Sequence, residues 1–257
     1  MKGLINLIII DIEKDNMITL IGTGHVFNLS SALIDIFDEK NPNVICVELD
    51  QQRLNALLLK KTDPERYKEA SKNNPFIYKI LARFQDNMAK EYGVSAGDEM
   101  LTAIHYAQSH GIPLELIDSN AQKLFARMLK SMTLSEKIKL FLSGFSGLFI
   151  RKERVEKELK KIESEFDKYL NEIGEKFPTI KKILIDERNE NMANRIIELT
   201  GHYENIIACI GDGHIIGISN ILDEKKFEYE TIRLNDLRNW KIKSETASFS
   251  FNIEYNN

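Results

Sequence analysis

Short hydrophobic runs alternate along the chain with segments whose apolar residues recur at helical spacing. The predicted strands are 4–12, 17–22, 44–47, 112–117, 206–210 and 227–234, and the predicted helices between them are 30–39, 51–60, 97–109, 187–199 and 215–222. This β-α-β-α order is typical of parallel strands that are covered by helices. We therefore predict an α/β fold with a largely parallel sheet, and an α+β fold is the alternative.

The C-terminal residues alternate strictly between apolar and polar. The apolar positions are Phe249, Phe251, Ile253 and Tyr255. Such alternation predicts a half-buried antiparallel strand, which would make the sheet mixed.

The stretch 119–185 follows a different pattern. Its apolar residues recur at alternating intervals of four and three, at Val155, Leu159, Ile162, Phe166, Tyr169 and Ile173. Such a heptad seam on a charged helix indicates a helical arm that packs on the core or pairs with another chain. We predict a single domain over residues 1–257, with 119–185 as a helical insertion and a homodimer through this arm as one option.

Composition and charge exclude several classes of protein. The chain has 257 residues, with 35 Lys and Arg against 39 Asp and Glu, so its formal net charge is −4. This balance leaves no basic excess for binding nucleic acid. No apolar run reaches the roughly 20 residues that span a bilayer, so we expect no transmembrane segment. Cys46 and Cys209 lie within apolar runs, which predicts buried, reduced thiols and a cytoplasmic location.

A five-residue pattern, Ile-Gly-x-Gly-His, occurs twice after a predicted strand. One copy ends in His25 and the other in His214. We interpret the pattern as a sign of two related β-α-β halves, each with a histidine at the carboxyl end of a strand, where open α/β sheets bind ligands. Imidazole can act there as a metal ligand or a proton carrier. A phosphate-binding loop is the alternative, although neither copy has a Gly-x-Gly-x-x-Gly pattern. Structural roles are expected for the other three histidines, His105, His110 and His202.

Charged residues follow the predicted strand 44–47. Glu48 stands at the end of this strand, where a carboxylate can bind metal or act as a general base. Asp50 is the expected N-cap of the next helix. Arg53, on the first turn of that helix, can hold Glu48 or a substrate carboxylate.

Two further clusters of charged residues adjoin predicted strands. Glu187 and Arg188 are expected in the first turn of the helix that precedes the second copy of the pattern, with Asp186 as its N-cap. Asp118 follows the fourth predicted strand, and Glu99 lies on the helix before that strand. A solvated helix face is the structural alternative for these residues.

Taken in order, these motifs resemble those of the TraB/PrgY/Tiki family. The matching stretches are Gly22-Thr23-Gly24-His25, Val47-Glu48-Leu49-Asp50 with Arg53, Gly97-Asp98-Glu99-Met100 with Ala103-Ile104, Leu116-Ile117-Asp118, Asp186-Glu187-Arg188 with Met192, and Gly211-Asp212-Gly213-His214 with Gly217-Ile218. Their order and spacing agree over about residues 17–220. Each stretch alone is common, whereas the complete set is specific.

The resemblance implies a metal site and a peptide ligand. In the Tiki branch the histidine motifs and the motif glutamate are associated with metal-dependent proteolysis, and the PrgY branch is associated with control of peptide pheromones. By this resemblance His25 and His214 are metal ligands, and Glu48 is a ligand or a base. The resemblance also favours catalytic roles for three further residues, Arg53, Glu187 and Arg188.

The leading hypothesis is a metal-dependent hydrolase, expected to be a peptidase that acts on small peptides or protein termini. The histidines and a carboxylate would hold a divalent metal ion, and Zn, Mn and Co all suit such ligands. The alternative is a non-enzymatic regulator of the pheromone-shutdown type, which binds or sequesters a peptide. A third hypothesis is an esterase-like hydrolase with histidine as base, although the chain has no Gly-x-Ser-x-Gly elbow.

Overall fold

Five parallel strands form one sheet in the part of the chain that the computed structural model describes, residues 17–24, 29–71, 97–147, 172 and 174–240. In chain order the strands are β1 (Met17–Thr23), β2 (Val44–Val47), β3 (Leu114–Leu116), β4 (Asn205–Gly211) and β5 (Tyr229–Ile232). Their spatial order is β3-β2-β4-β1-β5, and every neighbouring pair is parallel. The predicted α/β fold is confirmed.

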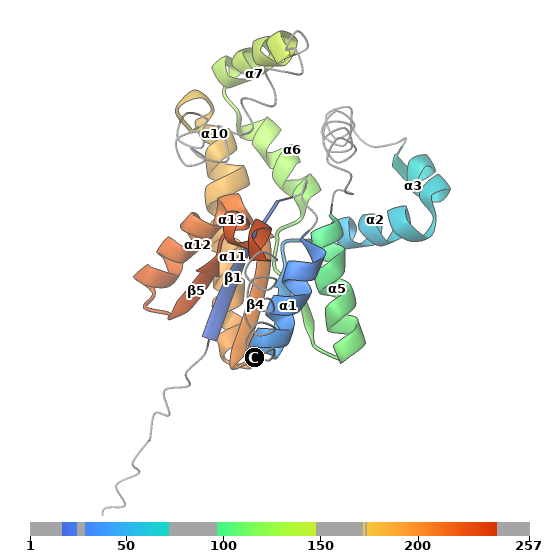
Figure 1. Cartoon of the computed structure of the whole chain (residues 1–257). Helices are drawn as coiled ribbons and strands as arrows, with labels where there is room; N and C mark the ends of the chain where they lie inside the picture. The colour runs from blue at the N-terminus through green and yellow to red at the C-terminus, as the bar shows by residue number, and fades with distance from the viewer. Residues whose placement is uncertain (1–16, 25–28, 72–96, 148–171, 173, 241–257) are drawn as a thin grey trace, which may run out of the picture.

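Helices cover both faces of this sheet (Figure 1). The described helices are α1 (Ser30–Lys40), α2 (Gln51–Thr62), α3 (Pro64–Ser71), α5 (Asp98–His110), α6 (Ala121–Ser131), α7 (Leu134–Gly147), α10 (Pro178–Lys181), the π-helix η1 (Lys182–Asp186), α11 (Glu187–Thr200), α12 (Asp212–Glu224) and α13 (Leu234–Arg238). On one face α1 and α5 bury Phe37 and Ile104 in an apolar core. On the other face α11 and α12 bury Met192 and Ile218 in a second core.

The two cysteines are buried, as predicted, but they belong to different cores. Cys46 of β2 lies on the face covered by α11, and Cys209 of β4 lies on the face covered by α5. Both thiols are free, and burial raises the pKa of each.

The two copies of the glycine-histidine pattern begin side by side at the centre of the sheet. β1 pairs with β4 so that Gly22 lies opposite Ile210 and Thr23 lies opposite Gly211. The units β1-α1-β2 and β4-α12-β5 interleave, because β4 lies between β1 and β2 while β1 lies between β4 and β5. A methyl group on Gly22 would overlap the Asp212 carboxylate, so this close approach requires glycine.

Some helix boundaries differ from those predicted. Asp186 does not cap a new helix, because α10, η1 and α11 run on continuously from Pro178 to Thr200 and Asp186 has helical backbone angles. α12 begins at Asp212 rather than at residue 215, so His214 lies in the first turn of a helix. The apolar side chains that predicted α12 start only after this charged first turn.

Three predicted features lie outside the described residues, namely the strand 4–12, the heptad seam from Val155 to Ile173 and the alternating segment 249–255. The homodimer through the arm therefore stays a prediction. Of the insertion 119–185, the structure describes α6, α7, α10 and η1, which pack through an apolar cluster that includes Leu124, Met128 and Ile183. Within the described ranges, no helix combines the length and the hydrophobicity of a membrane span.

Asp50 connects the start of α2 to the start of α6. Its Oδ1 accepts hydrogen bonds from the backbone N–H groups of Gln52 (2.8 Å) and Arg53 (3.2 Å), which confirms the predicted N-cap. Its Oδ2 accepts from Arg53 Nε (2.9 Å) and from the N–H of Ala121 (3.1 Å). One buried carboxylate thus satisfies donors from two helices and positions Arg53.

We expect Asp50→Ala to destabilise the fold more than the loss of an ordinary helix cap. An N-cap substitution costs about 1 kcal/mol, and this one also removes the hydrogen bonds of Asp50 Oδ2 to Ala121 N–H and to Arg53 Nε, so a loss of about 2–3 kcal/mol is expected. Urea unfolding followed by circular dichroism measures the change. Asp63→Ala is the matched control, because the exposed Asp63 caps α3 through the N–H of Arg66. Equal losses in the two variants would contradict the connecting role of Asp50.

Candidate functional site

The carboxyl end of β2 places Glu48 against the end of β4. The N–H of Glu48 donates to the carbonyl of Cys209 (3.1 Å), and Glu48 Oε2 accepts from the N–H of Gly211 (2.6 Å). Only 9% of the surface of Glu48 is exposed. A carboxylate that is so deeply buried needs charged partners.

Arg188 is the main partner of the carboxylates at this edge of the sheet. Its Nη2 forms an ion pair with Glu48 Oε1 and donates to Asp118 Oδ2 (2.6 Å), while its Nε donates to Asp118 Oδ1 (3.0 Å). The two bonds to Asp118 have the bidentate form that arginine makes with carboxylates. Because Glu48 follows β2 and Asp118 follows β3, Arg188 of α11 joins the ends of two neighbouring strands.

A π-helical turn precedes Arg188. η1 interrupts the α-helical hydrogen bonding just before α11, and such turns are frequent at functional sites. The carbonyl of Leu184, within this turn, accepts a hydrogen bond from Arg188 Nη1 (3.3 Å). The turn therefore helps to hold the guanidinium group over the strand ends.

His214 reaches the same cluster from the first turn of α12. Its Nε2 lies 3.1 Å from Arg188 Nη1 and 3.5 Å from Glu48 Oε1, and its Nδ1 lies 2.6 Å from Asn189 Oδ1. Arginine has no acceptor atom, so Nε2 of His214 must accept the hydrogen bond from Arg188. The proton of the neutral imidazole then resides on Nδ1, which donates to Asn189.

The surroundings lower the pKa values of Glu48, Asp118 and His214. Burial alone would raise the pKa of Glu48, but the facing His214 and Arg188 hold it below its usual value. Burial would likewise raise the pKa of Asp118, and Arg188 and Arg53 lower it. Burial lowers the pKa of His214, although Glu48 opposes this effect. At neutral pH the site therefore holds two ionised carboxylates and a neutral histidine.

Arg53 extends the cluster toward solvent. Its Nη2 pairs with Asp118 and its Nε with Asp50 (2.9 Å), and 33% of its side chain is exposed. The sequence predicted Glu48 or a substrate carboxylate as the partner of Arg53. The structure pairs Arg53 with Asp118 and Asp50 rather than with Glu48, and the contact with a substrate carboxylate stays a prediction. The cluster as a whole combines two guanidinium groups with three carboxylates, so one negative charge is in excess.

Glu187 faces away from this cluster, and Glu99 lies on the other side of the sheet from α11. Glu187 pairs with Arg127 of α6, because successive side chains on a helix project about 100° apart and only the next residue, Arg188, faces the strand ends. Glu99 is buried on α5, which covers the opposite face of the sheet from α11. His25 lies outside the described residues.

Asn189 is a site residue that sequence reasoning did not single out. A lone asparagine on an amphipathic helix is ordinary, so it carries no signal of its own. The sequence feature that could have pointed to Asn189 is Gly217 on α12, because a methyl group at this position would overlap the Asn189 amide. The glycine leaves the space in which Asn189 reaches His214.

The described residues supply two donors for a metal ion, but not a complete set. His214 Nε2 and Glu48 Oε1 face one another across 3.5 Å. Among the residues that the structure describes, no three His, Cys, Asp or Glu side chains form a metal-binding group. A metal centre at this edge would need a ligand from the rest of the chain.

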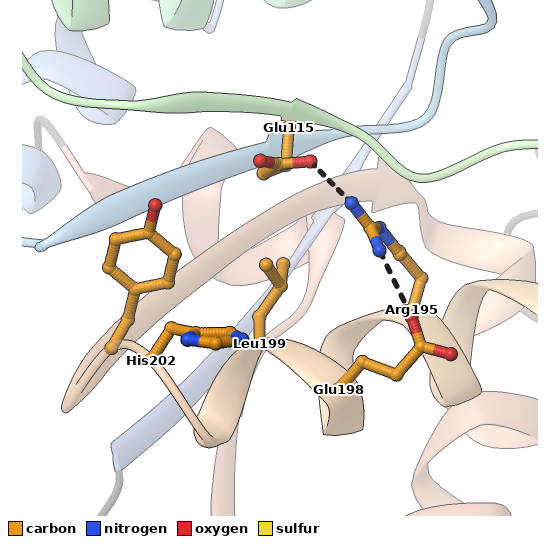
Figure 2. A pocket seen from close by; sticks show the side chains of 6 residues that line it. Glu115, Arg195, Glu198, Leu199 and His202 are labelled. Carbon is orange, nitrogen blue, oxygen red and sulfur yellow. Dashed lines mark hydrogen bonds and ion pairs between the residues drawn. The ribbon is translucent and has the colours of Figure 1, made fainter.

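The three remaining described histidines lie apart from the cluster. His105 and His110 are exposed on α5, and the His110 ring stacks on Tyr106. His202, just after α11, lines a separate surface pocket of about 450 Å³, in which Arg195 bridges Glu115 and Glu198 (Figure 2). The lining residues of this pocket are Glu115, Arg195, Glu198, Leu199, His202 and Tyr203. None of these belongs to the Arg188 cluster.

The fold and the cluster define an α/β protein with a buried charged site at the carboxyl edge of a parallel sheet. The family model described as TraB/PrgY/gumN matches residues 8–230, and the chain belongs to this family. The chain is also similar to an uncharacterized protein of Methanocaldococcus jannaschii, with 35% identity over 219 residues. That alignment covers 82% of this chain and 54% of the relative, so the chain spans about half the length of the relative.

We expect Gly217→Ala to change the tautomer of His214 through Asn189, without a direct contact between the new methyl group and the imidazole. The added methyl group would displace the Asn189 amide, so the Nδ1 hydrogen bond that selects the tautomer of His214 would be lost or lengthened. Nitrogen NMR of the imidazole should then report a mixture of tautomers, whereas the native chain should report a proton on Nδ1. Gly201→Ala is the matched control, because its methyl group would make only an ordinary contact with the Glu198 carbonyl. An unchanged His214 spectrum in Gly217→Ala would contradict the positioning role of Asn189.

The free energy of unfolding should fall as the pH is lowered from 7 to 5. The pKa of His214 in the folded protein lies below its ordinary value of 6.5, so the unfolded chain binds more protons and acid favours unfolding. The lowered pKa values of Glu48 and Asp118 act in the same direction, but only from about pH 5 downward. Urea titrations should therefore give a smaller change between pH 7 and 5 for His214→Gln than for His202→Gln. An equal pH dependence of the unfolding free energy in the two variants would refute the lowered pKa of His214.

Proposed function

We propose that the protein is a metal-dependent hydrolase that acts on small peptides or protein termini. The observation that carries the proposal is the neutral His214, whose Nε2 lone pair faces Glu48 and Arg188 while Asn189 holds the other ring nitrogen. Histidines that bind catalytic metals have this form, with the second nitrogen donating to a fixed acceptor. Membership of the TraB/PrgY/gumN family supports the proposal.

A divalent ion would take two ligands from the described residues, His214 Nε2 and Glu48 Oε1. The excess negative charge of the cluster favours a cation at this point. The third ligand would come from elsewhere in the chain, and His25 is the candidate because it follows Thr23 by two residues and Thr23 pairs with Gly211. Nitrogen and carboxylate ligands of this kind suit Zn, Mn or Co.

When bound, such an ion lowers the pKa of a water molecule and polarises a carbonyl group. The residues of the chain would perform the other tasks. Glu48 is ionised, so it can accept a proton from the attacking water if it does not bind the metal. Arg53, which is partly exposed, and Arg188 would donate to the developing oxyanion or to the terminal carboxylate of a peptide. Asp118 would keep both guanidinium groups in place.

A non-enzymatic peptide-binding protein is the second candidate. It is favoured by Arg188 Nη1, which occupies the Nε2 lone pair of His214. In that case Arg53, whose side chain is partly exposed, would bind an acidic or C-terminal carboxylate of the peptide, and His214 would stay the hydrogen-bond acceptor of Arg188.

Isothermal titration of the full chain with Zn, Mn and Co salts tests the metal site. We expect His214→Ala and His25→Ala each to weaken binding by at least about tenfold, because each removes a ligand. His202→Ala is the matched control and should bind as the native chain does, since His202 is exposed and lies apart from the cluster. If both ligand variants bind as tightly as the native chain, the shared metal site is wrong.

Mass spectrometry of a peptide mixture, with and without a chelator, separates the two candidates. A metal-dependent hydrolase should produce fragments that disappear when the chelator is added. A binding protein should retain intact peptides in stoichiometric amount, with no effect of the chelator. Turnover that persists in the chelator would overturn the metal-dependent mechanism.

A further inference from the structure

Exposed apolar side chains gather on α6 and α7. Three of the six large hydrophobic residues that are exposed within the described ranges lie here, Leu129 (39%), Leu134 (74%) and Ile138 (51%). α7 stands at the top of the molecule in Figure 1, away from the sheet, and α6 connects it to the core. A cluster of exposed apolar residues in one short stretch is unusual for a protein surface and indicates a contact.

The same stretch is basic although the whole chain is acidic. Residues 119–147 contain five basic residues, Lys123, Arg127, Lys130, Lys137 and Lys139, and a single acidic one, Glu136, whereas the net charge of the chain is −4. The four lysines are exposed. Glu136 is buried, so its charge does not offset theirs at the surface.

Glu136 fixes which side of α7 faces outward. It forms a capping box with Thr133, and its two oxygens also accept from the backbone N–H (2.8 Å) and hydroxyl (2.9 Å) of Thr179 at the start of α10. Burial alone would raise the pKa of Glu136, but these hydrogen bonds lower it to about 2. At a rotation of about 100° per residue, Leu134 and Ile138 lie on the side opposite Glu136, with Lys137 beside them.

We propose that the outer side of α7, formed by Leu134, Lys137 and Ile138, docks on the surface of an anionic lipid bilayer together with the exposed Leu129 and Lys130 at the end of α6, a few residues before it. The 14 residues of α7 are too few to span a bilayer, so the helix would lie in the headgroup region with its apolar side chains inward. The lysines beside them would contact the negative headgroups. The proposal goes beyond the hydrolase function and does not depend on it.

Charge and apolar complementarity favour the bilayer over a second copy of the chain and over a nucleic acid. A symmetric contact with a second copy would bring the lysines of one face against the lysines of the other, which is unfavourable. A nucleic acid would match the charge of the lysines, but its phosphate backbone offers no apolar surface for Leu134 and Ile138. An anionic bilayer presents both negative charge and an apolar interior to the same face.

Co-sedimentation of the full chain with vesicles tests the proposal. We expect binding to vesicles of phosphatidylcholine with phosphatidylglycerol, weak binding to phosphatidylcholine alone, and loss of binding at high salt. The double variant Leu134→Ser with Ile138→Ser should reduce the partition coefficient by about tenfold or more. Its control is Ile34→Ser with Ile216→Ser, which removes two exposed apolar side chains elsewhere, on α1 and α12, and should bind as the native chain does.

The charge variants complete the test. Lys130→Glu with Lys137→Glu should abolish the preference for phosphatidylglycerol, and Lys61→Glu with Lys225→Glu, on exposed positions of α2 and next to α12, should preserve it. Equal binding of the apolar variant and its control would overturn the proposal, as would native protein that ignores anionic vesicles. The proposal would also be overturned if the native protein formed a dimer without binding vesicles and the apolar variant were a monomer. That result would identify the face as an interface between two copies.

Discussion

The burial of Arg188 among carboxylates is the constraint on which the rest of the site depends. A charge so far removed from water is tolerated only when partners and hydrogen bonds surround it. Glu48, Asp118 and the Leu184 carbonyl supply those partners. Since they come from the end of β2, the segment after β3 and the π-turn, the arginine requires all three segments to meet at one point. Removal of any member would leave an uncompensated charge inside the protein.

The parallel sheet makes this meeting possible. Its strands end at one common edge, where the helix that follows β4 brings His214 and the helix before β4 brings Arg188 and Asn189. The interleaving of the two β-α-β units places the ends of β1 and β4 side by side, so residues far apart in the chain share one small volume. A charged site with a neutral histidine can then form between the ends of the strands, without any long loop to carry it.

Local sequence patterns predicted those features whose physical cause lies within a few residues of the chain. Asp50 was predicted as an N-cap because its side chain binds N–H groups only two and three residues ahead. The positions of β2 and β4 followed from short buried apolar runs, and Glu48 from its place at a strand end. The N-cap predicted at Asp186 was wrong, because η1 leads into α11 without a break and Asp186 keeps helical backbone angles.

The sequence by itself determined the class of fold, the family and the edge of the sheet at which charged residues collect, because hydrophobic periodicity and short motifs encode these. Only the tertiary structure decided which charges pair. In the folded chain Arg188 pairs with Glu48, whereas its neighbour Glu187 pairs with Arg127. Arg53 pairs with Asp118 rather than with Glu48, and Asn189 forms a hydrogen bond with His214. The physical reason is that these ion pairs and the tautomer depend on distances of about 3 Å between residues that are 25 or more positions apart, and no periodicity along the chain reports those distances.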